Sequence, residues 1–305
     1  MRGIVHGLAA IIALAPVALF IGVHISGGPS AECVDIDGCT ALINAGGETK
    51  ADLAMDYYNR GTAYSAAGMH DEAIADFTRA LALRPDDANA FNNRGNAWLA
   101  KGLLDEAIAD ETNAIALNPD LAIAYNNRGN AYGKKHNYEK AIADETRAIT
   151  LRPDLAIAYG NRGNAYENEG QDDAAIADFA KVMELTPEDA NAWFNRGVVY
   201  IRRAGYDQAI ADFTHALALQ PDRAALYDNR GWTYHLKGDD TKALPDIGKA
   251  VALAPNDAHI RATRAAIYER LGFRDNAVAD YRTMLTLGAY QQLAEDRLKR
   301  LGATP

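Results

Sequence analysis

The triplet Asn-Arg-Gly recurs at a fixed interval of 34 residues, and this period constrains the fold more than any other feature of the chain. Its six copies begin at Asn59, Asn93, Asn127, Asn161, Asn195 and Asn229. With the glycine set as position 8 of a 34-residue repeat, repeats 1 to 7 begin at residues 54, 88, 122, 156, 190, 224 and 258. A period of this length predicts stacked copies of one supersecondary unit over residues 54–287.

Within one repeat the apolar residues follow the helical period. In repeat 3, Tyr125, Gly129 and Tyr132 share one stripe, and Ala141 and Ala148 share another farther on. Glycine separates the two segments in five repeats, at Gly68, Gly102, Gly170, Gly238 and Gly272, and a proline at position 32 can end the second segment in six. Each repeat is therefore predicted to form two antiparallel helices. The glycine at position 8 is expected to be a notch that faces the alanine at position 20, as Gly129 would face Ala141.

These repeats resemble tetratricopeptide repeats (TPRs). The family pattern has aromatics at positions 4, 11 and 24, Gly at 8, Ala at 20 and 27, and Pro at 32. Repeat 5 meets it with Trp193, Gly197, Tyr200, Ala209, Phe213, Ala216 and Pro221. The resemblance implies an all-α fold, a right-handed superhelical solenoid of about seven TPR helix-turn-helix units. It also implies a concave surface, lined by the first helices, that binds a peptide or protein segment.

Caps are expected at both ends of the solenoid. Residues 32–53 resemble an N-terminal half repeat, with a lone second helix near residue 40. Residues 288–305 are expected to form an amphipathic C-terminal capping helix, whose leucines cover the last repeat.

The first 31 residues have the composition of a secretory signal peptide. Arg2 precedes an apolar run over residues 8–23, and small residues follow. Cleavage is favoured over retention as an anchor, because the run is shorter than a spanning helix and contains Pro16. The protein is therefore expected to be periplasmic or secreted, or else anchored in the inner membrane and facing the periplasm. An uncleaved anchor would be its only association with a membrane.

Export makes the two cysteines informative. Cys33 and Cys39 are the only cysteines, and both follow the expected signal. An oxidising compartment favours a disulfide between them. Two unpaired thiols are the alternative, and a metal site is disfavoured because no histidine lies nearby to complete the ligand set.

Two positions depart from the TPR pattern in every repeat, because position 7 is Arg and position 23 is Asp. The pairs are Arg60/Asp76, Arg94/Asp110, Arg128/Asp144, Arg162/Asp178, Arg196/Asp212, Arg230/Asp246 and Arg264/Asp280. Because the family's usual residues at positions 7 and 23 are both replaced by opposite charges, we expect ion pairs between the two helices of each repeat. A structural network is favoured over a charged binding strip, since a pair present in every repeat fits the scaffold better than a single site.

Glu111 and Glu145 stand at position 24, where four other repeats have Phe77, Phe179, Phe213 and Tyr281. Two carboxylates one repeat apart could form an acid pair or a cation site. The favoured alternative is that they reach solvent or pair with bases such as Lys134 and Lys135, because no histidine or third acid accompanies them.

The candidate binding site consists of positions 2, 5, 9 and 12 of the first helices, which line the concave surface in the family. Asparagines there could hold the backbone of an extended peptide, and an apolar patch farther along could anchor side chains. The asparagines are Asn92, Asn96, Asn126, Asn130 and Asn164; the patch comprises Phe194, Val198, Ile201, Trp232 and His235. The alternative is that these residues are structural. The family's lysine clamp for carboxyl-terminal peptides is not matched.

No enzymatic motif is present, so no catalytic residue, cofactor or metal is predicted. The seven histidines are scattered, and the chain has no phosphate-binding loop, zinc motif or dinucleotide fingerprint. A net charge of -10 without a basic stripe argues against nucleic acid. The expected function is a non-enzymatic scaffold or adaptor of the bacterial envelope that binds a peptide or protein segment. The alternatives are a periplasmic chaperone-like holder of unfolded chains and a non-catalytic regulatory subunit of an envelope enzyme.

Overall fold

The computed structural model describes residues 33–46 and 49–304, and every regular element in those ranges is an α-helix. The chain divides into two compact units, which meet at Pro119 and Asp120. The first unit contains α1 (Ile36–Ala45), α2 (Lys50–Ala66), α3 (His70–Leu83), α4 (Ala88–Ala100) and α5 (Leu104–Leu117). The second contains α6 (Ala122–Lys134), α7 (Tyr138–Leu151), α8 (Ala156–Asn168), α9 (Asp172–Leu185), α10 (Ala190–Arg202), α11 (Tyr206–Leu219), α12 (Ala224–Lys237), α13 (Asp240–Leu253), α14 (Ala258–Leu271), α15 (Arg274–Thr286) and α16 (Gln291–Arg300).

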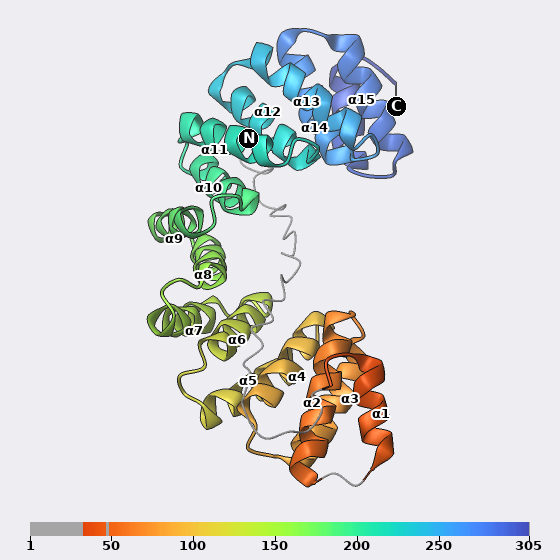
Figure 1. The fold of residues 1–305 in the computed structure, drawn as a ribbon. Coiled ribbons are helices and arrows are strands. Elements are labelled where there is room, and N and C mark those ends of the chain that lie inside the picture. Colours follow the sequence, from red (N-terminus) through yellow and green to blue (C-terminus); the bar gives the residue numbers. More distant parts are fainter. Residues whose placement is uncertain (1–32, 47–48, 305) are drawn as a thin grey trace. The chain divides into compact units, whose positions relative to one another are not determined.

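Each repeat is a pair of antiparallel helices, as the period predicted. The even-numbered helices from α2 to α14 are the first helices, and each packs on the second helix that follows it (Figure 1). Within each unit neighbouring first helices also contact one another, whereas second helices do not. The first helices therefore stack more closely, so their side is the inner side of each unit. The chain is an all-α repeat solenoid.

The turn inside each repeat requires a left-handed residue. Glycine supplies it in five repeats, as predicted, with Gly170 at φ 73°. The other two turns use His136 at φ 59° and Ala204 at φ 56°, so a residue with a β-carbon takes the conformation that glycine takes elsewhere. Six second helices end two residues before the proline at position 32, in agreement with the role predicted for it.

The notch at position 8 has a different occupant from the one predicted. A β-carbon added to Gly163 would lie 2.8 Å from Cε1 of Phe179, and one added to Gly129 would lie 2.8 Å from Oε1 of Glu145. In repeats 1 to 5 the side chain at position 24 fills the notch, not the alanine at position 20. In repeat 6 the notch lies directly against the backbone of the second helix, beside the carbonyl oxygen of Ala243, and in repeat 1 the carbonyl oxygen of Ala73 also lies 3.3 Å from a β-carbon added to Gly61.

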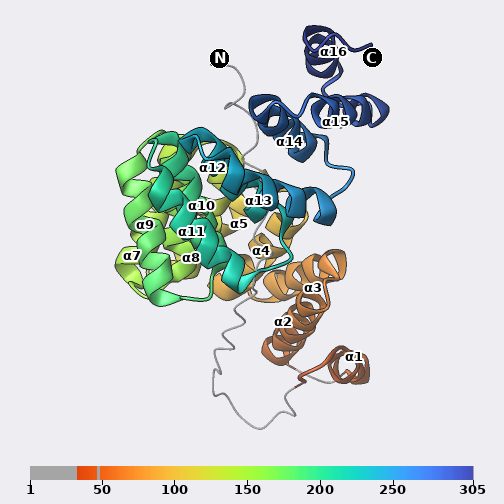
Figure 2. The same cartoon turned by 90° about the horizontal axis from the view of Figure 1, so that it is seen from above.

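The first unit begins with α1, which lies beside α2 in both views (Figures 1 and 2). Residues 1–31 lie outside the described residues. Cys33 and Cys39 form a disulfide that ties the start of the described chain to α1. Thr40 on α1 accepts a hydrogen bond from Nη1 of Arg60 at 3.0 Å, and Thr78 on α3 does the same for Arg94. Thus α1 occupies the place that a second helix takes before each later repeat.

The second unit ends with α16, which packs on α15. Ala294 and Leu298 are fully buried there, and Leu293 and Leu301 are partly buried against the same cluster. The last turn of α16 carries Arg297, Lys299 and Arg300. The helix thus covers the apolar end of repeat 7.

Candidate functional site

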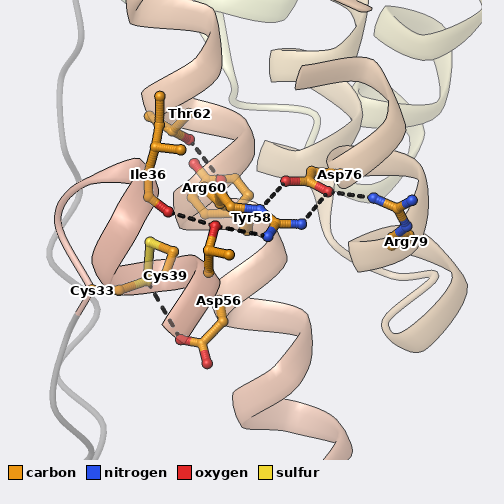
Figure 3. Close-up of polar contacts among 10 residues, drawn as sticks. Cys33, Ile36, Cys39, Asp56, Tyr58, Arg60, Thr62, Asp76 and Arg79 are labelled. Atoms are coloured by element: carbon orange, nitrogen blue, oxygen red, sulfur yellow. Dashed lines mark hydrogen bonds and ion pairs between the residues drawn. A yellow bond between two sulfur atoms is a disulfide. The ribbon is translucent and has the colours of Figure 1, made fainter. Parts of the chain in front are cut away.

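The arginine at position 7 and the aspartate at position 23 form a bidentate ion pair in all seven repeats. In repeat 4, Nε and Nη2 of Arg162 each donate to a carboxylate oxygen of Asp178 at 2.8 Å. The seven aspartates are buried, and each arginine lies over the aromatic ring at position 4 of its repeat, or over the ring at position 11 in repeat 7. Figure 3 shows the first pair, with Arg79 also donating to Asp76. The charges of each pair are thus satisfied within the fold, and the carboxylates are buried, which agrees with the structural interpretation.

The two glutamates at position 24 are fully buried, so the expectation that they reach solvent is wrong. Glu145 fills the notch of Gly129, and neither of its carboxylate oxygens accepts a hydrogen bond among the described residues. Lys134 and Lys135 are exposed, and Glu145 forms no ion pair with a lysine in the part of the chain that the structure describes. Burial raises the pKa of Glu145 well above its ordinary value, although the Asn161 amide and Arg162 act in the opposite direction.

A cation site at these glutamates finds no support. Within residues 33–46 and 49–304, no group of three or more His, Cys, Asp or Glu side chains could hold a metal ion. No helix in the same ranges is long and apolar enough to cross a membrane.

We call the residues at positions 2, 5, 9 and 12 of the first helices the first-helix face. The structure divides its asparagines into two groups. Asn92 and Asn126 are buried, and each donates to the asparagine that follows it. Asn126 also accepts from Asn161 at 3.1 Å, and Asn164 accepts from Asn195 at 3.0 Å. The amides of Asn126 and Asn164 therefore join neighbouring repeats, and the amide of Asn92 bonds within α4, contrary to the predicted continuous peptide ladder.

Asn96 and Asn130 behave differently. Both are partly exposed, and neither side chain forms a hydrogen bond among the described residues. Their amides keep donors and acceptors that the fold does not use, so they remain candidates for contact with a partner.

The apolar residues on α10 are partly buried, not solvent-facing as predicted. Phe194, Val198 and Ile201 pack against a core cluster that includes Phe213 and Leu217. Each still exposes part of its surface. They form a shallow apolar strip along one helix.

Trp232 lies on the neighbouring first helix, α12, which contacts α10. Its indole is partly exposed and stacks on the ring of His235, with the centroids 5.1 Å apart. The indole N–H donates no hydrogen bond among the described residues. His235 is held in turn by Asp240, with Nδ1 and Oδ1 2.6 Å apart, and Arg270 donates to both Asp240 and the carbonyl oxygen of His235. The His235 ring, held by Asp240 and Arg270, thus positions the Trp232 indole, whose N–H has no acceptor among the described residues.

Two polar residues of this face, Asp228 and His259, and one beside it, Arg223, were not predicted from the sequence. Asp228 is buried, its Oδ1 has no hydrogen-bond partner among the described residues, and its Oδ2 lies 3.6 Å from Nε2 of His259 on α14. Burial raises the pKa of Asp228 to about 6, and His259 acts to lower it. Arg223 precedes α12 and lies over the ring of Phe194, 4.7 Å from its centroid. Position 34 is an aspartate before α4, α10 and α14. The basic residue at this position before α12 could therefore have been noticed in the sequence.

Helix pairs repeated every 34 residues define a helical-repeat protein, whose first helices carry unused amides and a partly exposed indole. Models of the tetratricopeptide repeat match residues 54–87, 122–155, 156–189 and 194–258, and a TPR repeat model matches residues 95–136. Together they match more than half of the chain, which therefore belongs to the tetratricopeptide-repeat family.

Solved structures agree with this assignment. The TPR protein YrrB, described as having an unusual peptide-binding site, is 26% identical with a TM-score of 0.52, over 59% of this chain and 92% of YrrB. MamA protein is also 26% identical, with a TM-score of 0.51, over 58% of this chain and 94% of MamA. A tetratricopeptide repeat protein from Parabacteroides merdae ATCC 43184 is 21% identical, with a TM-score of 0.60, over 81% and 98%, which shows the shared fold alone. No curated protein sequence matches the chain.

Proposed function

We propose that this protein is a non-catalytic interaction module of the bacterial envelope that binds a peptide or protein segment on its first-helix face. The observation that carries the proposal is the state of Trp232. Its indole is partly exposed on the inner side of the second unit and leaves its N–H unused. Aromatic side chains of this kind are frequent anchors in protein interfaces.

Other residues of the first-helix face also support the proposed binding surface. The strip of Phe194, Val198 and Ile201 lies on the helix next to that of Trp232, so apolar side chains of a partner could pack on both. Asn130 offers an amide to the backbone of an extended segment. The likeness to YrrB, whose description includes a peptide-binding site, is in keeping with this use of the fold.

The cellular location is a separate part of the proposal. The composition of residues 1–31 and the disulfide between Cys33 and Cys39 favour an oxidising compartment. Mass spectrometry of the mature protein from the periplasmic fraction tests this, and we expect a shortened amino terminus with both cysteines protected from alkylation. An intact chain with reactive thiols in the cytoplasm would contradict an envelope location.

Position-specific photocrosslinking in the cells that make the protein tests the binding surface. Benzoylphenylalanine at Ile201 lies on the first-helix face, and the same group at the exposed Ala218 of α11 lies on the second-helix side and is the matched control. We expect adducts from Ile201 and few from Ala218. Equal yields at the two positions would count against the first-helix face.

The identity of the adducts separates the three functions. One dominant partner favours an adaptor, and many unrelated chains captured through apolar segments favour a chaperone-like holder. A regulatory subunit would yield one envelope enzyme, whose activity changes when the protein is added.

A further inference from the structure

Arg223 stands at a position that is occupied by a capping aspartate before α4, α10 and α14 and by a leucine without a side-chain cap before α6 and α8. In three other repeats the residue before the first helix is an aspartate that caps it, and Asp87, Asp189 and Asp257 each accept a backbone N–H within the first turn of α4, α10 or α14. Arg223 stands at the same place before α12 and provides no side-chain cap. Its positive charge also lies at the positive end of the helix dipole. Leu121 and Leu155 also lack a cap, but Arg223 adds an unfavourable charge, which points to a role outside the fold.

The contacts of Arg223 leave its charge unpaired. Nη1 donates to Oδ1 of Asn191 at 2.9 Å and to Oε1 of Gln220 at 3.2 Å. Nε and Nη2 donate to none of the described residues, and no carboxylate of the described chain lies within ion-pair distance. Burial lowers the pKa of Arg223, although Asp189 acts to raise it. A planar guanidinium with one donor edge unused matches a carboxylate in geometry as well as in charge.

Apolar surface continues from this cation. The guanidinium carbon lies 4.7 Å from the centre of the Phe194 ring, and Val198 and Ile201 follow at one-turn spacing along α10. Trp232 lies on the adjacent α12. Asp228 does not neutralise the cation, because its carboxylate faces His259 on α14. The surface thus presents a positive group at one end and an apolar strip beyond it.

We infer that the partner segment carries an aspartate or glutamate whose carboxylate pairs with Arg223, next to apolar side chains that pack on Phe194, Val198, Ile201 and Trp232. The inference rests on the proposed function and adds to it the chemistry of the partner. The positive charge of Arg223 favours an acidic residue in the partner, and the apolar strip favours apolar residues next to it.

Three fluorescent libraries of acetylated nonapeptide amides test it. Their central residue is fixed as Asp, Asn or Lys, and the other positions contain every residue except Cys and the charged ones. Binding to the full chain is measured by anisotropy at low and high salt. We expect the Asp library to bind about tenfold more tightly than the Asn library, with the difference reduced by salt.

Two variants test whether Arg223 causes the preference for the Asp library. Arg223→Gln should remove the difference between the Asp and Asn libraries. Arg223→Asp should reverse it in favour of the Lys library and, because it restores the aspartate cap, should also raise the melting temperature. Loss of binding by Arg223→Asp therefore could not be attributed to unfolding. Equal binding of the Asp and Asn libraries by the wild-type protein, or an acidic preference that survives in Arg223→Gln, would overturn the inference.

The Trp232→Ala protein distinguishes a failure of this inference from a failure of the proposed function. If the Asp and Asn libraries bind equally and Trp232→Ala weakens both, the peptide-binding face stands and the acidic preference falls. If no library binds the wild-type chain, both fall.

Discussion

Arg162 and Asp178 join the two helices of repeat 4 through two parallel hydrogen bonds of 2.8 Å each. Nη1 of the same guanidinium donates to Thr146 of the preceding repeat at 3.0 Å. One side chain thereby links three helices, α7, α8 and α9. Because the carboxylate is buried, its removal would leave a poorly solvated cation without its counter-charge.

Asp178→Asn is expected to lower the free energy of unfolding by about 3 kcal/mol, because a buried ion pair loses one partner. Urea denaturation followed by circular dichroism measures the change. Asp173→Asn is the matched control, since Asp173 pairs with Arg203 on the exposed surface of the same helix and should cost about 1 kcal/mol or less. Equal losses in the two variants would contradict a structural role for the buried pairs.

Glu145 is expected to make stability fall as pH rises. The pKa of its buried carboxyl is raised in the folded chain, so the folded state holds a proton that the unfolded state has released once the pH exceeds about 4.3. The stability contribution is therefore complete below that pH and is lost, at up to about 1.4 kcal/mol per pH unit, until the pH passes the raised pKa.

Urea denaturation of the wild-type and Glu145→Gln proteins between pH 4 and pH 8 measures this effect. The glutamine cannot ionise, so the wild-type protein should lose stability relative to the variant as pH rises. The comparison is clearest above pH 6, beyond the raised pKa of Asp228. Glu139→Gln, at an exposed site on the same helix, should leave the pH dependence unchanged. Parallel curves for the wild-type and Glu145→Gln proteins would show that the buried carboxyl is not protonated.

Ala204 holds a left-handed conformation that glycine adopts at the same turn in five other repeats. Ala204→Gly should stabilise the chain by about 1 kcal/mol, because it removes the contact between the β-carbon and the backbone. The reverse change, Gly170→Ala at φ 73°, should destabilise by a similar amount. Melting curves of the two variants give the comparison, and a lower melting temperature for Ala204→Gly would rule out strain at this turn.

The sequence was sufficient for the helix pairs and the ion pairs, because both follow from a pattern repeated every 34 residues. It was not sufficient for the notch. Periodicity shows that Gly129 and Ala141 share a helix interface, but a side chain as long as that of Glu145 can reach the notch from one turn farther along α7. Occupied amides were missed for a similar reason, since the bond between Asn126 and Asn161 joins separate repeats. Arg223 was visible as an exception in the sequence, yet its stacking on Phe194 required the structure.

Trp193 and Trp232 offer a matched pair for the binding surface. Trp193, at position 4, lies beneath Arg196, stacks on His215 and packs against two core clusters. Its replacement by alanine should lower the melting temperature and, in the protein that remains folded, leave peptide affinity unchanged. Trp232 belongs instead to the first-helix face.

The most direct measurement uses peptides selected from a library by binding to the wild-type protein. The affinity of the Trp232→Ala protein for these peptides is measured together with its melting temperature. We expect the dissociation constant to rise at least about tenfold while the melting temperature falls by only a few degrees. An unchanged dissociation constant, or a loss of stability as large as that of Trp193→Ala, would contradict peptide binding on this face.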